Sequence, residues 1–231
     1  MKLLPKKLRD FRHRCFYNLL ESRADGLKTL GDQSRGVQWT ILPTLLNAKS
    51  IVYSGGVGDD ISFEHALVKE VGCDIVLLDP SPVGMKTMAL PENKLPHFRF
   101  LPLALADHSG RLKLAHHPDN AESWYTCDGD TAATFEIPCA DLHSLMQQNG
   151  HTHIDLLKLD IEGSEYAVID DFLRRRIPVR QVCADFDFGY TPGIRRSQAI
   201  RAILKLVTGG YKLVCHEHAN HTFIRSQWPV R

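Results

Sequence analysis

Residues 51–79 read IVYSGGVGDDISFEHALVKEVGCDIVLLD, and this stretch decides the fold. A short apolar run leads into a glycine-rich loop, then a segment with helical spacing, then a second apolar run that ends at an aspartate. The order predicts a buried strand at 51–53, a helix at 61–70 and a second strand at 74–78. The two strands should be parallel, because a helix between them returns the chain in the same direction.

The same alternation of strands and helices continues to the end of the chain, with an irregular or antiparallel region at 111–139. Further strands are predicted at 98–104, 154–159, 180–186, 211–215 and 222–225, and further helices at 140–149, 164–174 and 194–207. The last two strands are too close for a crossover and should form an antiparallel hairpin. We therefore predict an α/β domain at 49–231 with a doubly wound, mostly parallel sheet.

Residues 1–48 are predicted to form a helical extension packed on this domain. The first 20 residues combine leucines and phenylalanines with lysines and arginines, as in an amphipathic helix with a basic face. A second helix is predicted at 35–46. We favour a solvated basic face; the alternative is peripheral contact with an anionic membrane or substrate.

Composition limits the class of protein. The 231 residues are 43% hydrophobic and 24% charged with a net charge of +1, which is typical of a globular protein and gives no reason to expect nucleic-acid binding. No apolar run is long enough to span a membrane. The six cysteines are scattered, without a C-x-x-C pair, which favours a reducing, cytoplasmic location. The sequence does not fix the oligomeric state.

The glycine-rich loop is the first candidate for ligand binding, with contacts expected from Ser54, Gly55, Gly56 and Gly58. Glycine tolerates positive φ and lets the backbone approach a ligand closely. The loop follows a strand, so it should lie at the carboxyl edge of the sheet, where open α/β folds bind ligands. The alternative is a glycine-rich turn that merely closes a strand–helix corner.

Asp79 strengthens the first interpretation, because it ends the next strand about twenty residues past the loop, where a carboxylate can accept ribose hydroxyls. The two features together indicate an adenosine cofactor, which leaves nicotinamide, flavin and S-adenosylmethionine open. The loop is not a clean G-x-G-x-x-G, which disfavours dinucleotides. Asp107 follows the third strand and could accept from an adenine amino group, although its local sequence favours a turn residue.

Residues 157–165, LKLDIEGSE, resemble the K-x-D-x-E-G-x-E signature of the FkbM-type methyltransferases. The glycine loop, Asp79 and the ALADHSGRL stretch at 104–112 fit the same family, so the resemblance spans roughly residues 50–190. It implies a seven-stranded Rossmann-like class I methyltransferase fold with S-adenosylmethionine as methyl donor. It also implies O-methylation of a hydroxyl on a small-molecule or saccharide acceptor, glycolipids included.

Two positions depart from the family pattern. The family often has an acidic residue at the end of the first strand, where this chain has Tyr53-Ser54. A later strand commonly ends in E-x-H, where this chain has Asp185-Phe186-Asp187. If the histidine is a base in relatives, Asp187 takes its place here.

Methyl transfer to a hydroxyl needs alignment of the reactants and removal of a proton. Lys158 and Asp160 should point to the same side of their strand and form an ion pair. Asp160, which we also expect beside the cofactor, and Asp187 are the candidate bases, and Lys158 would stabilise developing oxygen charge. Three more acids are assigned to the substrate or to supporting contacts: Glu162, Glu165 and Asp185.

Other interpretations of this edge remain open. Glu165 has a slightly favoured alternative as a complement to the positive end of the following helix. Converging carboxylates can hold a divalent cation, but no spacing here is diagnostic, so a metal is not favoured. Trp124 could line a substrate pocket or cover a hydrophobic edge.

Two further functions compete with a methyltransferase. One is a non-catalytic protein of methyltransferase descent that binds an adenosine cofactor, supported by the altered E-x-H position. The other is an NAD-dependent oxidoreductase on a similar fold, which the irregular glycine loop disfavours.

Overall fold

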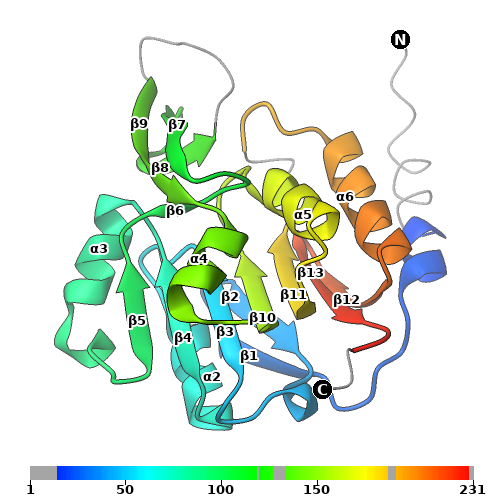
Figure 1. The fold of residues 1–231 in the computed structure, drawn as a ribbon. Coiled ribbons are helices and arrows are strands. Elements are labelled where there is room, and N and C mark those ends of the chain that lie inside the picture. Colours follow the sequence, from blue (N-terminus) through cyan, green and yellow to red (C-terminus); the bar gives the residue numbers. More distant parts are fainter. Residues whose placement is uncertain (1–14, 119, 127–133, 187–190, 229–231) are drawn as a thin grey trace, which may run out of the picture.

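The computed structural model describes residues 15–118, 120–126, 134–186 and 191–228 (Figure 1). Within these residues the centre is a seven-stranded sheet in the order β12-β13-β11-β10-β3-β4-β5. Its strands are β3 (Ile51–Gly55), β4 (Asp74–Leu78), β5 (Phe98–Leu101), β10 (Ile154–Leu159), β11 (Val179–Asp185), β12 (Tyr211–Glu217) and β13 (Asn220–Arg225).

Strand direction follows the prediction. Neighbouring strands from β5 to β11 are parallel, whereas β13 is antiparallel to both β11 and β12. Numbered along the chain from one to seven, the strands run 3-2-1-4-5-7-6 across the sheet. This is the doubly wound order with one antiparallel strand inserted near an edge. The predicted class I methyltransferase architecture, with its closing hairpin, is therefore confirmed.

Helices cover both faces of the sheet. One face packs against α4 (Leu142–Asn149), α5 (Glu165–Arg174) and α6 (Arg196–Thr208). The other packs against α2 (Ser62–Val71), with α3 (Pro82–Ala89) contributing Met88. Side chains along a strand alternate between faces, so Leu157 and Leu159 join the first core and Leu156 joins the second. Lys158 shares the face of Leu156 and points toward α2.

The prediction of a helix at 35–46 is wrong. The chain instead forms an antiparallel hairpin of β1 (Lys28–Asp32) and β2 (Val37–Ile41), followed by the short 3-10 helix η1 (Pro43–Leu45). Apolar side chains at positions 37, 39 and 41 alternate with polar ones, which is the period of a strand. Gly36 makes the turn with a φ of 74°.

The hairpin is fixed to the central sheet by polar contacts. The Gln181 amide accepts from Leu42 N at 2.9 Å and donates to its carbonyl at 3.2 Å, and Thr222 Oγ1 donates to Thr40 O at 2.5 Å. The hairpin thus covers β11 and β13 on the α2 face. Residues 15–20 are helical, while 1–14 lie outside the described residues. The division between 1–48 and 49–231 stays a prediction.

A second, four-stranded sheet occupies the region expected to be irregular or antiparallel. Its order is β6-β9-β7-β8, from β6 (Ala104–Leu105), β7 (Gly110–His117), β8 (Asn120–Thr126) and β9 (Thr134–Ala140). It projects beyond β5 and α3 at the upper left of the view (Figure 1). Thr126 ties it to the loop after β10, donating from N to Glu162 O at 3.0 Å and pairing its hydroxyl with that of Ser164 at 2.6 Å.

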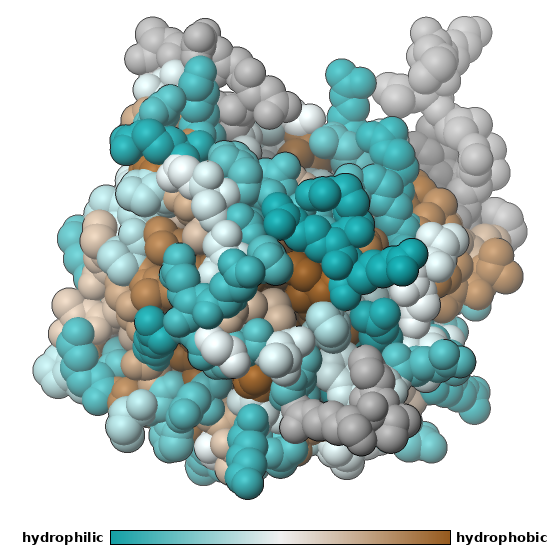
Figure 2. All heavy atoms as spheres, in the orientation of Figure 1, coloured by the Kyte–Doolittle hydropathy of each residue, from teal (hydrophilic) through white to brown (hydrophobic). Residues whose placement is uncertain are grey.

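Most of the visible surface mixes hydrophilic and hydrophobic residues (Figure 2). Hydrophobic atoms gather beside the helix at 15–20, where the Leu19 residue is 85% exposed. None of the helices in the described part of the chain is long and apolar enough to cross a membrane. The five cysteines in that part are all free thiols.

The Trp39→Ala variant tests whether the hairpin belongs to the core. Trp39 is 3% exposed and packs with Ile41 and Phe63, so its truncation leaves a cavity. We expect a loss of about 3–5 kcal/mol in the free energy of unfolding, measured by chemical denaturation. The control, Leu19→Ala, should change it by less than about 0.5 kcal/mol. Equal effects would contradict the packing described here.

Candidate active site

A cavity of about 390 Å³ lies at the carboxyl ends of β3, β4 and β10. This volume is within the range of small-molecule sites. The position is the topological switch point of the sheet. From β3 the chain continues to β4 and β5 on one side, and it later returns to β10 and β11 on the other side. Part of the lining is apolar and comes from the β1–β2 hairpin and the four-stranded sheet: Val37, Trp39, Leu105, Leu112, Leu114 and Trp124. Acidic side chains form much of the rest: Asp59, Asp60, Glu64, Asp79, Asp160 and Glu162.

The glycine loop packs directly on the chain that leaves β10. Gly56 has a φ of 85°, and a Cβ added there would lie 1.9 Å from the Asp160 carbonyl oxygen. A Cβ on Gly55 would lie 2.9 Å from Ile161 Cγ2. Gly56 and Gly58 line the cavity. Gly55 and Gly56 are therefore required by the close approach of the loop to the chain after β10.

Ser54 takes a different position from the one expected. Its side chain is fully buried below the loop and donates a 2.5 Å hydrogen bond to Glu64 Oε1. Neither Ser54 nor Gly55 is among the residues that line the cavity. Both lie in β3, which leads into the loop.

Asp79 organises the loop from the end of β4. Its Oδ2 accepts from the backbone N–H groups of Val57 at 2.9 Å and Gly58 at 2.8 Å, and its Oδ1 accepts from Ser81 at 2.7 Å. A carboxylate has about four acceptor positions, so the three bonds leave one for a ligand hydroxyl. Gly84 makes room for this carboxylate, because a Cβ there would lie 2.5 Å from Asp79 Cγ.

Lys158 is a buried cation at the centre of the site. Its Nζ donates to Gly56 O at 2.7 Å and lies 3.5 Å from Glu64 Oε1, 3.8 Å from Asp160 Oδ2 and 5.6 Å from the centre of the Trp39 ring. Burial alone would lower the pKa of Lys158, but the Glu64 and Asp160 carboxylates outweigh it and the pKa is raised. The ammonium group is therefore charged. The predicted ion pair with Asp160 is present.

Asp160 is the carboxylate that is open to the cavity beside this lysine. Its side chain is 41% exposed, in contrast to the 6% of Lys158. The pKa of Asp160 is raised, because the group is withdrawn from bulk water and because Glu64 and Asp79 lie near; Lys158 opposes this shift. A carboxylate with a raised pKa is a stronger proton acceptor than an ordinary aspartate.

The remaining acids of this edge divide into two groups. Glu162 lines the cavity at a φ of 50° and accepts from Thr191 Oγ1 at 3.3 Å. Glu165 is turned away, accepting from Ile161 N at 2.7 Å and Gly163 N at 2.9 Å, and burial raises its pKa to about 8. Its contacts favour the structural alternative, in which it holds the turn before α5.

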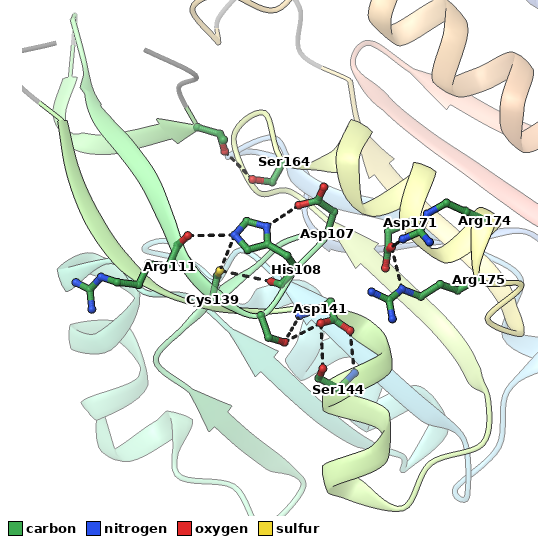
Figure 3. A network of polar contacts seen from close by, with 12 residues as sticks. Asp107, His108, Arg111, Cys139, Asp141, Ser144, Ser164, Asp171, Arg174 and Arg175 are labelled. Carbon is green, nitrogen blue, oxygen red and sulfur yellow. Dashed lines mark hydrogen bonds and ion pairs between the residues drawn. The ribbon is translucent and has the colours of Figure 1, made fainter. Parts of the chain in front are cut away.

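Asp185 and Asp107 lie outside the main cavity. Asp185 lines a side pocket of about 30 Å³ with Glu162, Glu165 and Tyr166. Asp107 is exposed and pairs with His108 Nδ1 at 2.8 Å, as Figure 3 shows, which is the local turn contact that its sequence favoured. The other predicted base, Asp187, lies outside the described residues.

Sequence reasoning missed two residues at the centre of the site, Glu64 and Trp39. Glu64 is the acidic residue in the first turn of α2, where an acid is ordinarily explained by the helix dipole. Trp39 lies in the hairpin that was taken for a helix. Trp124 was recognised with two alternatives and fits both, since it lines the cavity and packs at 4.7 Å on the Phe135 ring.

Among the residues that the structure describes, no group of three or more His, Cys, Asp or Glu side chains is arranged to hold a metal ion. Of the acids that line the cavity, Glu64 and Asp160 instead pair with Lys158, Asp79 with backbone N–H groups, and Asp59 and Asp60 with Arg35.

A comparison with protein families gives the family of this chain. The model of the methyltransferase FkbM domain matches residues 47–212. The chain belongs to the FkbM methyltransferase family. No curated protein matches it in a sequence comparison. Among solved structures it is similar to M. jannaschii TYW2 in complex with AdoMet, with 9% identity and a TM-score of 0.35 over 88% of this chain and 89% of that one.

Membership makes the chain a methyltransferase that depends on S-adenosylmethionine, as the signature at 157–165 predicted. The cavity fits this cofactor on three observations. Gly56 and Gly58 bring the loop to the cavity, Asp79 retains an acceptor position next to the loop, and the lining is rich in carboxylates that suit a sulfonium cation. The oxidoreductase alternative has no support from the family.

The Asp79→Ala variant tests how this FkbM methyltransferase holds its cofactor. The change removes the acceptor of two loop N–H groups, so we expect the dissociation constant of S-adenosylhomocysteine to rise about tenfold or more in calorimetry. The control is Asp74→Ala, at the exposed opposite end of β4, which should bind as the wild type does. Equal affinity of the two variants would contradict the assignment of Asp79.

The Gly56→Ala variant tests the close approach of the loop to β10. The control is Gly36→Ala, where φ is 74° but nothing lies within 4 Å of the added Cβ. The control should lose only the cost of a left-handed alanine, about 1–2 kcal/mol of unfolding free energy. Gly56→Ala should lose about 3 kcal/mol or more, because the Cβ overlaps backbone. Similar losses in thermal or chemical unfolding would argue against a tight contact.

Proposed function

We propose that this FkbM methyltransferase acts on a hydroxyl oxygen of a neutral small molecule or saccharide, with Asp160 accepting the hydroxyl proton. One observation carries the proposal: a carboxylate with a raised pKa opens into the cavity directly beside a buried lysine. A neutral hydroxyl is a weak nucleophile, so it needs a base at the point of attack. Nitrogen and sulfur acceptors depend less on such a base.

The roles of the residues follow from their contacts. S-adenosylmethionine supplies an electrophilic methyl group on its sulfonium. Asp160 accepts the proton of the acceptor hydroxyl, and Lys158 at 3.8 Å orients the carboxylate and favours negative charge on nearby oxygen. Glu162 is available to position the acceptor, since it faces the same cavity. Asp187 remains the second candidate base.

Charge supports a neutral acceptor. The six acids named above line the cavity, while Lys158 pairs with Glu64 and Asp160 and Arg35 pairs with Asp59 and Asp60. The acids therefore outnumber these two cations. A phosphate or carboxylate on the acceptor would be repelled in this setting. Neutral polyols and sugars meet no such cost. The apolar part of the lining offers contact to the less polar face of the same molecule.

A screen of neutral saccharides and polyols, beside their phosphorylated counterparts, tests the substrate class. The methylated atom should be a hydroxyl oxygen by mass spectrometry and NMR. Methylation at nitrogen, sulfur or carbon would overturn the proposal. Binding of S-adenosylhomocysteine with no methylated product from any acceptor class would favour a non-catalytic protein of methyltransferase descent.

The Asp160→Asn variant tests the base. Loss of a general base lowers kcat by about 10²–10⁴-fold, while the dissociation constant of S-adenosylhomocysteine should change little. The wild-type kcat/KM should rise with pH as Asp160 of the free enzyme loses its proton, with an acid limb above the ordinary aspartate pKa of 3.8, and the variant should lack this limb. The control is Asp170→Asn on the exposed face of α5. Unchanged kcat in Asp160→Asn would rule out this role.

A further inference from the structure

Glu64, in the first turn of α2, reaches Ser54 of β3 beside the glycine loop. The Ser54 hydroxyl donates to Glu64 Oε1 at 2.5 Å, and both side chains are almost fully buried. A carboxylate from α2 therefore lies within one hydrogen bond of the strand that leads into the glycine loop.

Strand register places the side chains of Ser54 and Lys158 next to each other below Glu64. Ser54 of β3 pairs directly with Lys158 of β10, so the two side chains project side by side from the same face. Glu64 reaches over both, with the same oxygen 3.5 Å from Lys158 Nζ. An acid at position 54 would meet Lys158 from within the sheet; Glu64 meets it from the helix above.

The position on α2 suits a buried anion. Glu64 is the third residue of the helix, in the first turn, where the partial positive charge of the helix stabilises a carboxylate. The hydroxyl of Ser54 and the ammonium of Lys158 compensate the remaining cost of burial.

We propose that Glu64 is a positioning residue that, through Lys158, fixes the glycine loop for cofactor binding. Lys158 Nζ donates to Gly56 O at 2.7 Å, which orients the loop peptide that faces the cavity. Without the Glu64 charge, Asp160 at 3.8 Å is the nearest remaining anion, and the ammonium shifts toward it and away from Gly56. The inference concerns the cofactor side of the site and holds whatever the acceptor is.

Glu64→Gln tests the charge with nearly unchanged shape. We expect the dissociation constant of S-adenosylhomocysteine to rise about tenfold or more, because a charged partner of a buried group is lost. The matched control is Glu70→Gln, on the same helix, whose carboxylate pairs with Lys28 at 2.6 Å on the exposed surface. It should bind as the wild type does. Wild-type affinity in Glu64→Gln would overturn the proposal.

The double variant Ser54→Asp with Glu64→Ala moves the carboxylate from α2 to β3. It distinguishes an effect of the charge on cofactor binding from an effect of Glu64 on folding stability. We expect S-adenosylhomocysteine binding to recover to within about threefold of the wild type, although the melting temperature of the ligand-free protein stays lowered by the lost packing. Binding as weak as in Glu64→Gln, in a double variant that melts cooperatively, would show that Glu64 acts only as a stabilising buried pair and would overturn the proposal.

If the double variant does not melt cooperatively, Ser54→Ala decides the question. It removes the hydroxyl and keeps the Glu64–Lys158 pair, so binding should stay within about threefold of the wild type. A loss as large as that of Glu64→Gln would assign the effect to the hydroxyl and overturn the proposal. Because every readout is binding or melting, failure here is distinct from failure to find a hydroxyl acceptor.

Discussion

The buried ammonium of Lys158 is the interaction on which the rest of the site depends. A charge removed from water must be compensated closely, and this one is compensated by a loop carbonyl, a helix carboxylate and an aspartate of its own strand end. These partners belong to the β3 loop, to α2 and to the segment after β10. A single cation thereby holds together three elements that are far apart in the sequence, at the edge of the sheet where the cavity opens.

The surrounding structure serves to exclude water from this cluster. Trp39 of the hairpin covers Lys158 from the α2 face, and the Arg35 guanidinium at the hairpin turn pairs with Asp59 and Asp60 at 2.7 Å each. On the other side, Thr126 attaches the second sheet to the turn at Glu162. Both additions to the seven-stranded core thus end at the same cavity. Electrostatic interactions are stronger in such a sheltered place than in bulk water.

The central sheet and the Lys158–Asp160 pair were predictable, because both depend on local patterns: uniformly apolar parallel strands, and two residues at the period of one strand. The hairpin at 28–41 was overlooked, although the alternation of Val37, Trp39 and Ile41 with polar residues has the period of a strand. The N-capped helix α3 was overlooked although Ser81 and Pro82 mark its start. The Glu64 contact required the packing of α2 on the sheet, which no local pattern encodes.

The charge balance of the cluster links cofactor binding to base strength. Glu64, Asp79 and Asp160 surround one lysine, so when all are ionised the cluster has two more negative than positive charges. Burial raises the pKa of Asp160, and the Glu64 and Asp79 carboxylates raise it further. The negative excess also lowers the electrostatic cost of a cation that enters the cavity. A sulfonium bound there favours the ionised form of Asp160, which is the form that accepts a proton. The same carboxylates that suit a cationic cofactor therefore prepare the base that we assign to the acceptor hydroxyl.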